Sequence, residues 1–153
     1  MKSYGLARFV LVCGLAWPMV GGAQDKGTWR AASKNASAIT GDVALSNERL
    51  VIQFLGFTMA QIRSLTAAEV SAVFDVENGA RGVGTLYRVN VPATRKFLRK
   101  NSLCGGEDTQ YMVTYAEGKS LQVAFFSGAG APALTLDAVQ SSTDLCGTFS
   151  YVR

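Results

Sequence analysis

Histidine is absent from the 153 residues of this chain. This excludes Ser-His-Asp and Cys-His catalytic sites, metal sites with imidazole ligands and pH sensors based on histidine. Charged residues are also scarce, at 17% of the chain, whereas hydrophobic residues make up 48%. Such a composition is too apolar for a disordered protein, because it supplies enough apolar surface for a packed core. The length corresponds to one average domain.

Long hydrophobic runs are missing as well. None reaches the ~20 residues that a helix needs to cross a bilayer. The short run Phe9–Ala16 follows a basic, polar start and precedes small residues that end at Ala23. This order is typical of a secretory signal peptide. We therefore expect a signal peptide over residues 1–23, a single domain over residues 24–153, and a periplasmic or secreted location.

Removal of the leader would leave a nearly balanced charge. The leader contains Lys2, Arg8 and no acidic residue, so the formal net charge would fall from +4 to +2. A balance this close to neutral gives little support to a nucleic-acid partner, and we predict none.

Two cysteines, Cys104 and Cys146, would remain after cleavage. An even number of cysteines in an exported domain predicts a disulfide. Each is followed by a glycine, which lets two backbones approach closely. The bridge would close a loop of roughly 40 residues and stabilise the fold by roughly 4 kcal/mol. A redox pair is less well supported, because neither cysteine belongs to a C-x-x-C motif.

Alternation of apolar and polar residues runs through the rest of the chain and predicts β-strands. The first expected strand begins at Ile39. The others cover residues 50–55, 57–65, 83–91, 111–115, 121–125 and 146–152, with a weaker one near 134–139. Turns are predicted at residues 46–48, 77–79 and 117–119, the last as a hairpin, and Gly56 is expected to mark a bulge or bend.

Two segments carry helical signals. Thr66 and Glu69 form a capping-box pattern, yet residues 70–76 also alternate as a strand would. Helix and strand therefore both remain open for residues 66–76, with strand slightly favoured. From Pro92 to Lys100 we expect a short helix, because proline suits the first helical position and basic residues suit the C-terminal end of the helix dipole.

Together these elements predict a mainly β fold: a single small antiparallel β-barrel, or a sandwich, with one or two short helices and one disulfide. Gly27-Thr28-Trp29 resembles the G-x-W motif that opens the first strand of lipocalins, where the tryptophan closes one end of an eight-stranded barrel. The resemblance covers three residues and implies a hydrophobic ligand cavity. The simpler interpretation, which we favour, is a tryptophan packed at one end of a barrel.

Adjacent aromatic residues predict more than one apolar layer. Phe125 and Phe126 fall on opposite faces of one expected strand, so one of them must point outward or into a second packed layer. An outward, uncovered Phe126 would be a candidate contact for a partner.

The densest charge cluster consists of Arg95, Lys96, Arg99 and Lys100. On a helix these residues would form one basic strip, which could contact lipid phosphates, acidic glycans or an acidic protein. The interpretation that we favour for this strip is a solvated face that complements the helix dipole.

Motifs for known chemistry are not recognisable. The sequence contains no nucleophile elbow, phosphate loop or calcium loop, and we predict no cofactor and no metal site. The favoured function is that of an exported, non-catalytic β-barrel that binds a protein partner or a small apolar ligand in the cell envelope or outside. The alternatives are an enzyme of unfamiliar type that uses carboxylate, tyrosine or arginine residues, and a structural envelope component that contacts anionic surfaces through its basic strip.

Overall fold

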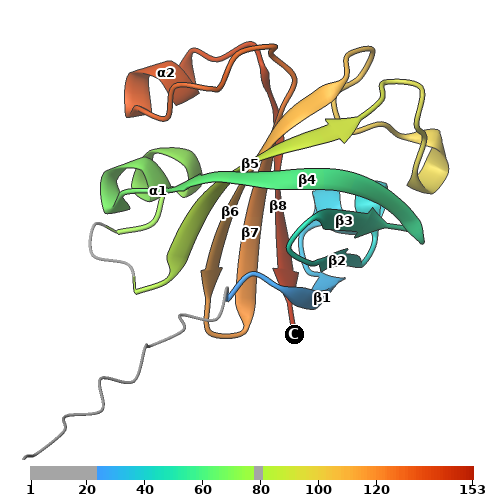
Figure 1. The fold of residues 1–153 in the computed structure, drawn as a ribbon, viewed down its shortest axis with the longest axis horizontal. Coiled ribbons are helices and arrows are strands. Elements are labelled where there is room, and N and C mark those ends of the chain that lie inside the picture. Colours follow the sequence, from blue (N-terminus) through green and yellow to red (C-terminus); the bar gives the residue numbers. More distant parts are fainter. Residues whose placement is uncertain (1–23, 78–80) are drawn as a thin grey trace, which may run out of the picture.

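Figure 1 shows the protein as a computed structural model that describes residues 24–77 and 81–153. The expected signal peptide and part of the predicted turn at 77–79 lie outside the described residues. Eight strands form a closed antiparallel barrel, in which each strand pairs with the next along the chain and the last pairs with the first. The predicted mainly β fold is confirmed, as a barrel.

The elements follow one another in a simple up-and-down order. The strands are β1 (Gly27–Ala31), β2 (Val43–Leu45), β3 (Arg49–Ile52), β4 (Leu55–Ser64), β5 (Val83–Val91), β6 (Thr109–Glu117), β7 (Ser120–Phe126) and β8 (Leu145–Val152). Between them lie short helical segments: η1 (Ala36–Thr40), α1 (Ala67–Phe74), η2 (Leu98–Lys100) and α2 (Leu136–Gln140). The predicted hairpin at 117–119 joins β6 to β7, and the predicted turn at 46–48 joins β2 to β3.

Large apolar side chains fill the barrel interior, because alternate residues of each strand point inward. The largest of them are at most 1% exposed: Trp29, Leu50, Ile52, Tyr87, Met112, Leu121, Phe125, Phe149 and Tyr151. A cavity large enough for an organic ligand would leave accessible area on the side chains around it. These side chains therefore form one apolar cluster that is closed off from solvent.

A second apolar layer covers the outer face of β5, β6 and β7. Figure 1 shows α1 and α2 on this side of the sheet, and their buried residues form one cluster with the outward residues of the three strands. Phe126 belongs to this cluster and is 1% exposed. Of the two adjacent phenylalanines, Phe125 thus points inward and Phe126 into the second layer, so Phe126 is no exposed partner contact.

Residues 67–74 are helical, so the slight preference for a strand over residues 66–76 was wrong. The capping box decides the outcome: the Thr66 hydroxyl accepts the Glu69 N–H, and the Glu69 carboxylate accepts the Thr66 N–H. Arg63 adds two short hydrogen bonds to the same carboxylate. The apolar residues Val70 and Phe74 then lie on one helical face, against the sheet.

Helical segments also shorten one expected strand and replace another. The chain forms η1 over residues 36–40, and β2 begins only at Val43 rather than at Ile39. In η1 the buried Thr40 hydroxyl lies 2.8 Å from the Tyr151 hydroxyl, which draws this segment over the end of the barrel. Near 134–139 the chain forms α2, capped by Thr135. The barrel is already closed, so it offers no free edge to a further strand.

The apolar run at residues 50–55 is divided by a tight turn. Gln53 and Phe54 both have positive φ, at 50° and 67°, and Ile52 pairs with Leu55. Gly56 is no bulge, because it pairs with Val51 inside β4, and the irregularity in β4 falls between Gln61 and Arg63 instead. The usual Asn-Gly signal for such a two-residue turn is absent, which is why alternation alone did not reveal it.

The predicted disulfide between Cys104 and Cys146 is present, with the two Cα atoms 4.9 Å apart and 42 positions apart in sequence. It ties the segment before β6 to the start of β8. We expect reduction, or the double substitution Cys104→Ser and Cys146→Ser, to lower the free energy of unfolding by about 4 kcal/mol, because the open chain gains conformational entropy. Urea unfolding with and without reductant measures this loss. Equal midpoints would contradict it.

Candidate functional site

The most exposed large apolar side chain of the described residues is Phe54, which stands on the turn between β3 and β4. We call Gln53 and Phe54 the hairpin tip. Phe54 is 102% exposed, as open to solvent as in an extended chain. Burying such a side chain would be worth about 1.5–3 kcal/mol. The left-handed backbone adds a further cost for any residue with a Cβ atom. Two penalties at one position mark Phe54 as a candidate contact.

The basic residues lie in a loop rather than on the expected helix. We call residues 92–100 the basic loop. The helical part of this loop is one 3₁₀ turn, Leu98–Lys100. Within this turn Arg99 has a non-helical φ of 53°. Phe97 turns inward instead, and its ring meets the Phe57 ring edge-on at 5.9 Å. This anchor breaks the run of helical residues, so the predicted helix and its basic strip were wrong.

All four basic side chains of the loop nevertheless face solvent. Arg95, Lys96, Arg99 and Lys100 are exposed, although they do not line up along one helical face. The disulfide lies just after this loop, at Cys104. It therefore attaches the segment with the basic residues to β8.

The hairpin tip and Asn101, the residue that follows the basic loop, are hydrogen-bonded to the same segment, η1. The Gln53 side-chain amide donates a hydrogen bond to the Thr40 carbonyl (3.3 Å), and the Asn101 amide donates one to the Ala38 carbonyl (3.2 Å). Figure 1 shows both loops at the right-hand end of the barrel, beyond the arrowhead of β3. This shared support places an exposed aromatic ring and a group of cations at one end of the molecule.

Backbone strain is concentrated in these two loops. Among the described non-glycine residues with positive φ, Asp75 is the only one outside them; the others are Gln53, Phe54, Arg99 and Lys100. Such conformations persist only where the surrounding structure imposes them, and they are frequent at functional sites. The hydrogen bonds from Gln53 and Asn101 supply that constraint here.

A shallow hollow of about 440 Å³ lies beside Phe54 on the outer face of β1, β2 and β3. Its lining is formed by Thr28, Asp42, Val43, Ala44, Val51, Gln53 and Phe54. Because most of these side chains are small or apolar, the outer surface around the hairpin tip is apolar as well.

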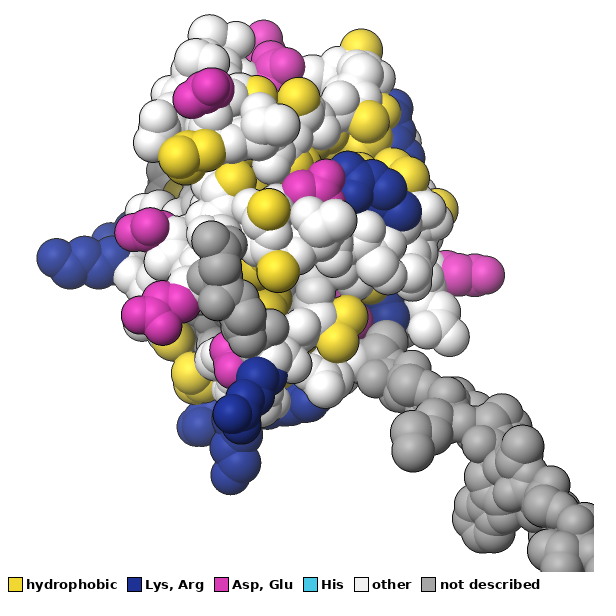
Figure 2. Space-filling model, turned by 90° about the vertical axis from the view of Figure 1, so that its left-hand side faces the viewer, with side chains coloured by type: hydrophobic (Ala, Val, Ile, Leu, Met, Phe, Trp, Pro, Cys, Tyr) yellow, Lys and Arg dark blue, Asp and Glu magenta, His cyan; other side chains and the backbone are white. Residues whose placement is uncertain are grey.

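The opposite side of the molecule has a different character. Figure 2 shows the side that carries α1 and α2, where apolar, acidic and basic side chains are interspersed. The most exposed large apolar residue here is Leu136, at the start of α2. It lies beside a hollow of about 360 Å³ between the two helices.

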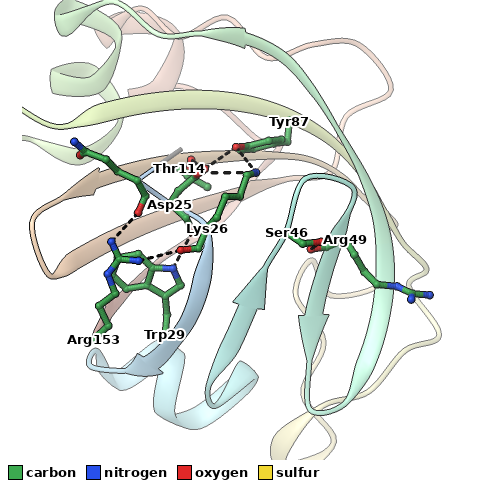
Figure 3. A network of polar contacts seen from close by, with 9 residues as sticks. Asp25, Lys26, Trp29, Ser46, Arg49, Tyr87, Thr114 and Arg153 are labelled. Atoms are coloured by element: carbon green, nitrogen blue, oxygen red, sulfur yellow. Dashed lines mark hydrogen bonds and ion pairs between the residues drawn. The ribbon is translucent and has the colours of Figure 1, made fainter. Parts of the chain in front are cut away.

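A buried polar network, which the sequence did not reveal, joins the first described residues to the barrel (Figure 3). Asp25 is 3% exposed, and its Oδ2 atom accepts hydrogen bonds from the Tyr87 hydroxyl (2.6 Å) and the Thr114 hydroxyl (2.9 Å). The Lys26 ammonium donates to the Tyr87 hydroxyl at 2.8 Å and lies 3.8 Å from Asp25 Oδ1. Tyr87 and Thr114 are about 60 to 90 positions away from Asp25 in sequence. A local sequence pattern therefore could not predict these contacts.

Burial shifts the pKa values of two members of this network, Tyr87 and Lys26. It raises the pKa of Tyr87, and the hydrogen bond to Asp25 raises it further. Burial also lowers the pKa of Lys26, against the attraction of Asp25. A carboxylate and a tyrosine do meet here, as an enzyme of unfamiliar type would require. Both are closed off from solvent, however, so the pair holds the N-terminal segment in the barrel rather than reaching a substrate.

Trp29 closes the same end of the barrel. Its indole N–H donates to the Asp25 carbonyl (2.8 Å), and the Arg153 guanidinium lies over its ring at 4.3 Å. Arg153 also donates to the Lys26 carbonyl, so both ends of the described chain meet here. The structure thus shows a tryptophan packed at one end of the barrel, which was the simpler interpretation of Gly27–Trp29.

Other types of site find no support among residues 24–77 and 81–153. No group of three or more cysteine, aspartate or glutamate side chains there could hold a metal ion. The helices of this part of the chain are too short or too polar to cross a membrane. Comparison of the whole chain with protein-family models, with curated proteins and with solved structures finds no match.

Tyrosine burial predicts a loss of stability at alkaline pH. The pKa values of Tyr87 and Tyr151 are both raised, chiefly by burial. Below pH ~10 both tyrosines are protonated in the folded and the unfolded chain. Above it they ionise first in the unfolded chain, so the free energy of unfolding falls as pH rises. Urea midpoints measured across this range test the trend. Tyrosinate absorbance from both residues before unfolding would contradict it.

Phe54 contributes no packing to the fold, and its backbone is strained. We therefore expect Phe54→Gly to leave the stability unchanged or to raise it by up to about 1 kcal/mol. Thermal unfolding of the two proteins measures the difference. The matched control is Phe57→Gly, which removes a buried ring of the same hairpin and should cost several kcal/mol. A clear loss of stability in Phe54→Gly would show that Phe54 has a structural role.

Proposed function

We propose that the mature chain is an exported, non-catalytic binding protein that contacts a partner through its outer surface, in the cell envelope or outside. Export is supported by the leader-like composition of residues 1–23 and by the disulfide, a bond that persists in oxidising compartments. The observation that carries the proposal is a contrast in exposure: the interior side chains are fully buried, whereas Phe54 on the hairpin tip is fully exposed.

A carrier of small apolar ligands is less well supported. Pockets for such ligands occupy about 300–1,000 Å³ and enclose most of the ligand. The side chains at the centre of this barrel, among them Phe125 and Phe149, instead fill the interior and contact one another, with ring centroids 5.3 Å apart. Of the two binding functions predicted from the sequence, the packing therefore favours a partner at the surface over a ligand inside.

The outer surface offers a contact of the kind that partners use. Exposed aromatic rings are frequent anchors of interfaces, because one ring buries much area at a small cost in conformational entropy. Phe54 stands beside an apolar hollow, and its side chain is free of contacts that the fold itself requires. The function that we propose is centred on this tip.

A ligand-binding test separates a packed interior from a carrier. We expect benzene to leave the melting temperature of the native protein unchanged, and native mass spectrometry to find no bound apolar molecule. The positive control is Phe125→Ala, which opens a cavity in the core. We expect this variant to be less stable by about 3–5 kcal/mol and to be stabilised by benzene.

The contrary result would be saturable binding of benzene or a lipid by the native protein that Phe54→Ser does not weaken. Such binding would place the ligand inside the barrel and would exclude a function limited to the outer surface. Binding that Phe54→Ser abolishes would instead locate it at the hairpin tip.

A further inference from the structure

We propose that the hairpin tip and the basic loop together dock the protein onto an anionic lipid bilayer. In this arrangement the Phe54 ring enters the boundary between headgroups and acyl chains. The side chains of Arg95, Lys96, Arg99 and Lys100 contact the lipid phosphates. This inference rests on the proposed function, because it names the partner class for the same outer surface.

The placement of the two loops carries the first step. Gln53 of the hairpin tip donates a hydrogen bond to the Thr40 carbonyl of η1, and Asn101, directly after the basic loop, donates one to the Ala38 carbonyl. A Cβ atom added at Gly41, directly after η1, would lie 3.3 Å from the Leu98 side chain, so the basic loop also packs on this segment. The two loops that carry the ring and the cations therefore lie at the same end of the barrel (Figure 1).

The apolar part of the site projects from the surface. Phe54 is 102% exposed and the next residue, Leu55, is 38% exposed. A ring that stands clear of the protein can enter a soft interface without a pocket shaped to receive it, and aromatic side chains favour the headgroup boundary of bilayers. A protein partner would need a cavity matched to this ring.

The charged part of the site is available for an external anion. Within residues 24–77 and 81–153, the ion pairs join Lys26 to Asp25 and Arg63 to Glu69, and none involves the basic loop. Clustered lysine and arginine side chains are attracted to anionic lipids, and each adds about fivefold to the affinity. Long, exposed cations adapt to a fluid layer of phosphates without a fixed register.

Carboxylates near this end oppose the attraction, and one of them, Asp144, lines the same hollow as Glu107 and Asp108. Asp108 accepts the Ala93 N–H (2.8 Å), and Asp42 accepts the Ala31 N–H (2.9 Å), so both are held by the backbone. Glu107, in the turn after Cys104, is exposed. The basic loop itself carries four cations and no acid between Pro92 and Lys100.

Vesicle sedimentation tests the proposal with the disulfide-bonded, exported protein. We expect binding to vesicles of phosphatidylcholine mixed with phosphatidylglycerol, and none to vesicles of phosphatidylcholine alone. High salt should weaken the binding, because it screens exposed charges. Absence of binding to the anionic vesicles would overturn the proposal.

Variants assign the binding to the two loops. We expect Phe54→Ser to weaken binding at least tenfold. The pair Arg95→Gln and Lys96→Gln should weaken it about 25-fold, from fivefold for each cation. The matched control is Leu136→Ser, which removes a half-exposed leucine from α2 on the other side of the molecule and should leave binding unchanged. Full binding by either loop variant, or equal loss in the control, would overturn the assignment.

A fluorescent variant reports the insertion directly. In Phe54→Trp we expect the emission to shift to the blue on anionic vesicles and to be quenched by brominated acyl chains. Trp29 is fully buried and should not respond. An unchanged emission from vesicle-bound protein would show that the tip stays in water, which contradicts the proposal.

Failure of this inference is distinguishable from failure of the proposed function. Poly-glutamate serves as a probe of acidic protein chemistry. Retention on poly-glutamate that requires the basic loop, without binding to vesicles, would replace the bilayer by an acidic protein and leave an outer-surface function in place. Benzene binding inside the native barrel would instead remove the proposed function itself.

Discussion

Packing of large apolar side chains inside a closed sheet is the interaction on which the rest of this structure depends. Residues such as Trp29, Phe125 and Tyr151 are buried in the interior and form the core of the barrel. Closure also removes free strand edges, which directs the remaining segments to cover the ends and the outside of the sheet. The function that we propose therefore places the partner at the outer surface.

The coverings differ between the sides of the barrel. On one side α1 and α2 bury a second apolar layer that includes Phe126. At one end Asp25, Trp29 and Arg153 join the two ends of the described chain in a polar and aromatic closure. Only the end that carries the hairpin tip and the basic loop combines strained backbone, an exposed ring and unpaired cations among the described residues. That combination costs stability, and the docking surface is inferred from it.

Strands were predictable where a strand pairs with another strand that is close to it in sequence. β6, the hairpin at 117–119 and β7 were recognised because alternation and turn residues act locally. The segments 66–76, 92–100 and 134–139 were misjudged for the opposite reason. In 66–76 and 134–139 short apolar periods fit a helix and a strand equally, and the choice is made by what the apolar face packs against. In 92–100 proline and basic residues favoured a helix, but the packing of Phe97 in the barrel core prevents it. The buried network around Asp25 left no local signal, because Tyr87 and Thr114 are supplied by distant strands.

Composition, alternation and the pair Cys104 and Cys146 were enough to predict a mainly β fold with one disulfide, because these properties are read from local periodicity and from residue counts. The tertiary structure alone decided that large side chains fill the barrel interior and that Phe126 is buried whereas Phe54 is exposed. It also decided that the hairpin tip and the basic loop lie at the same end of the barrel. Each of these depends on which distant residues come to lie side by side, and that is settled by sheet closure rather than by neighbours along the chain.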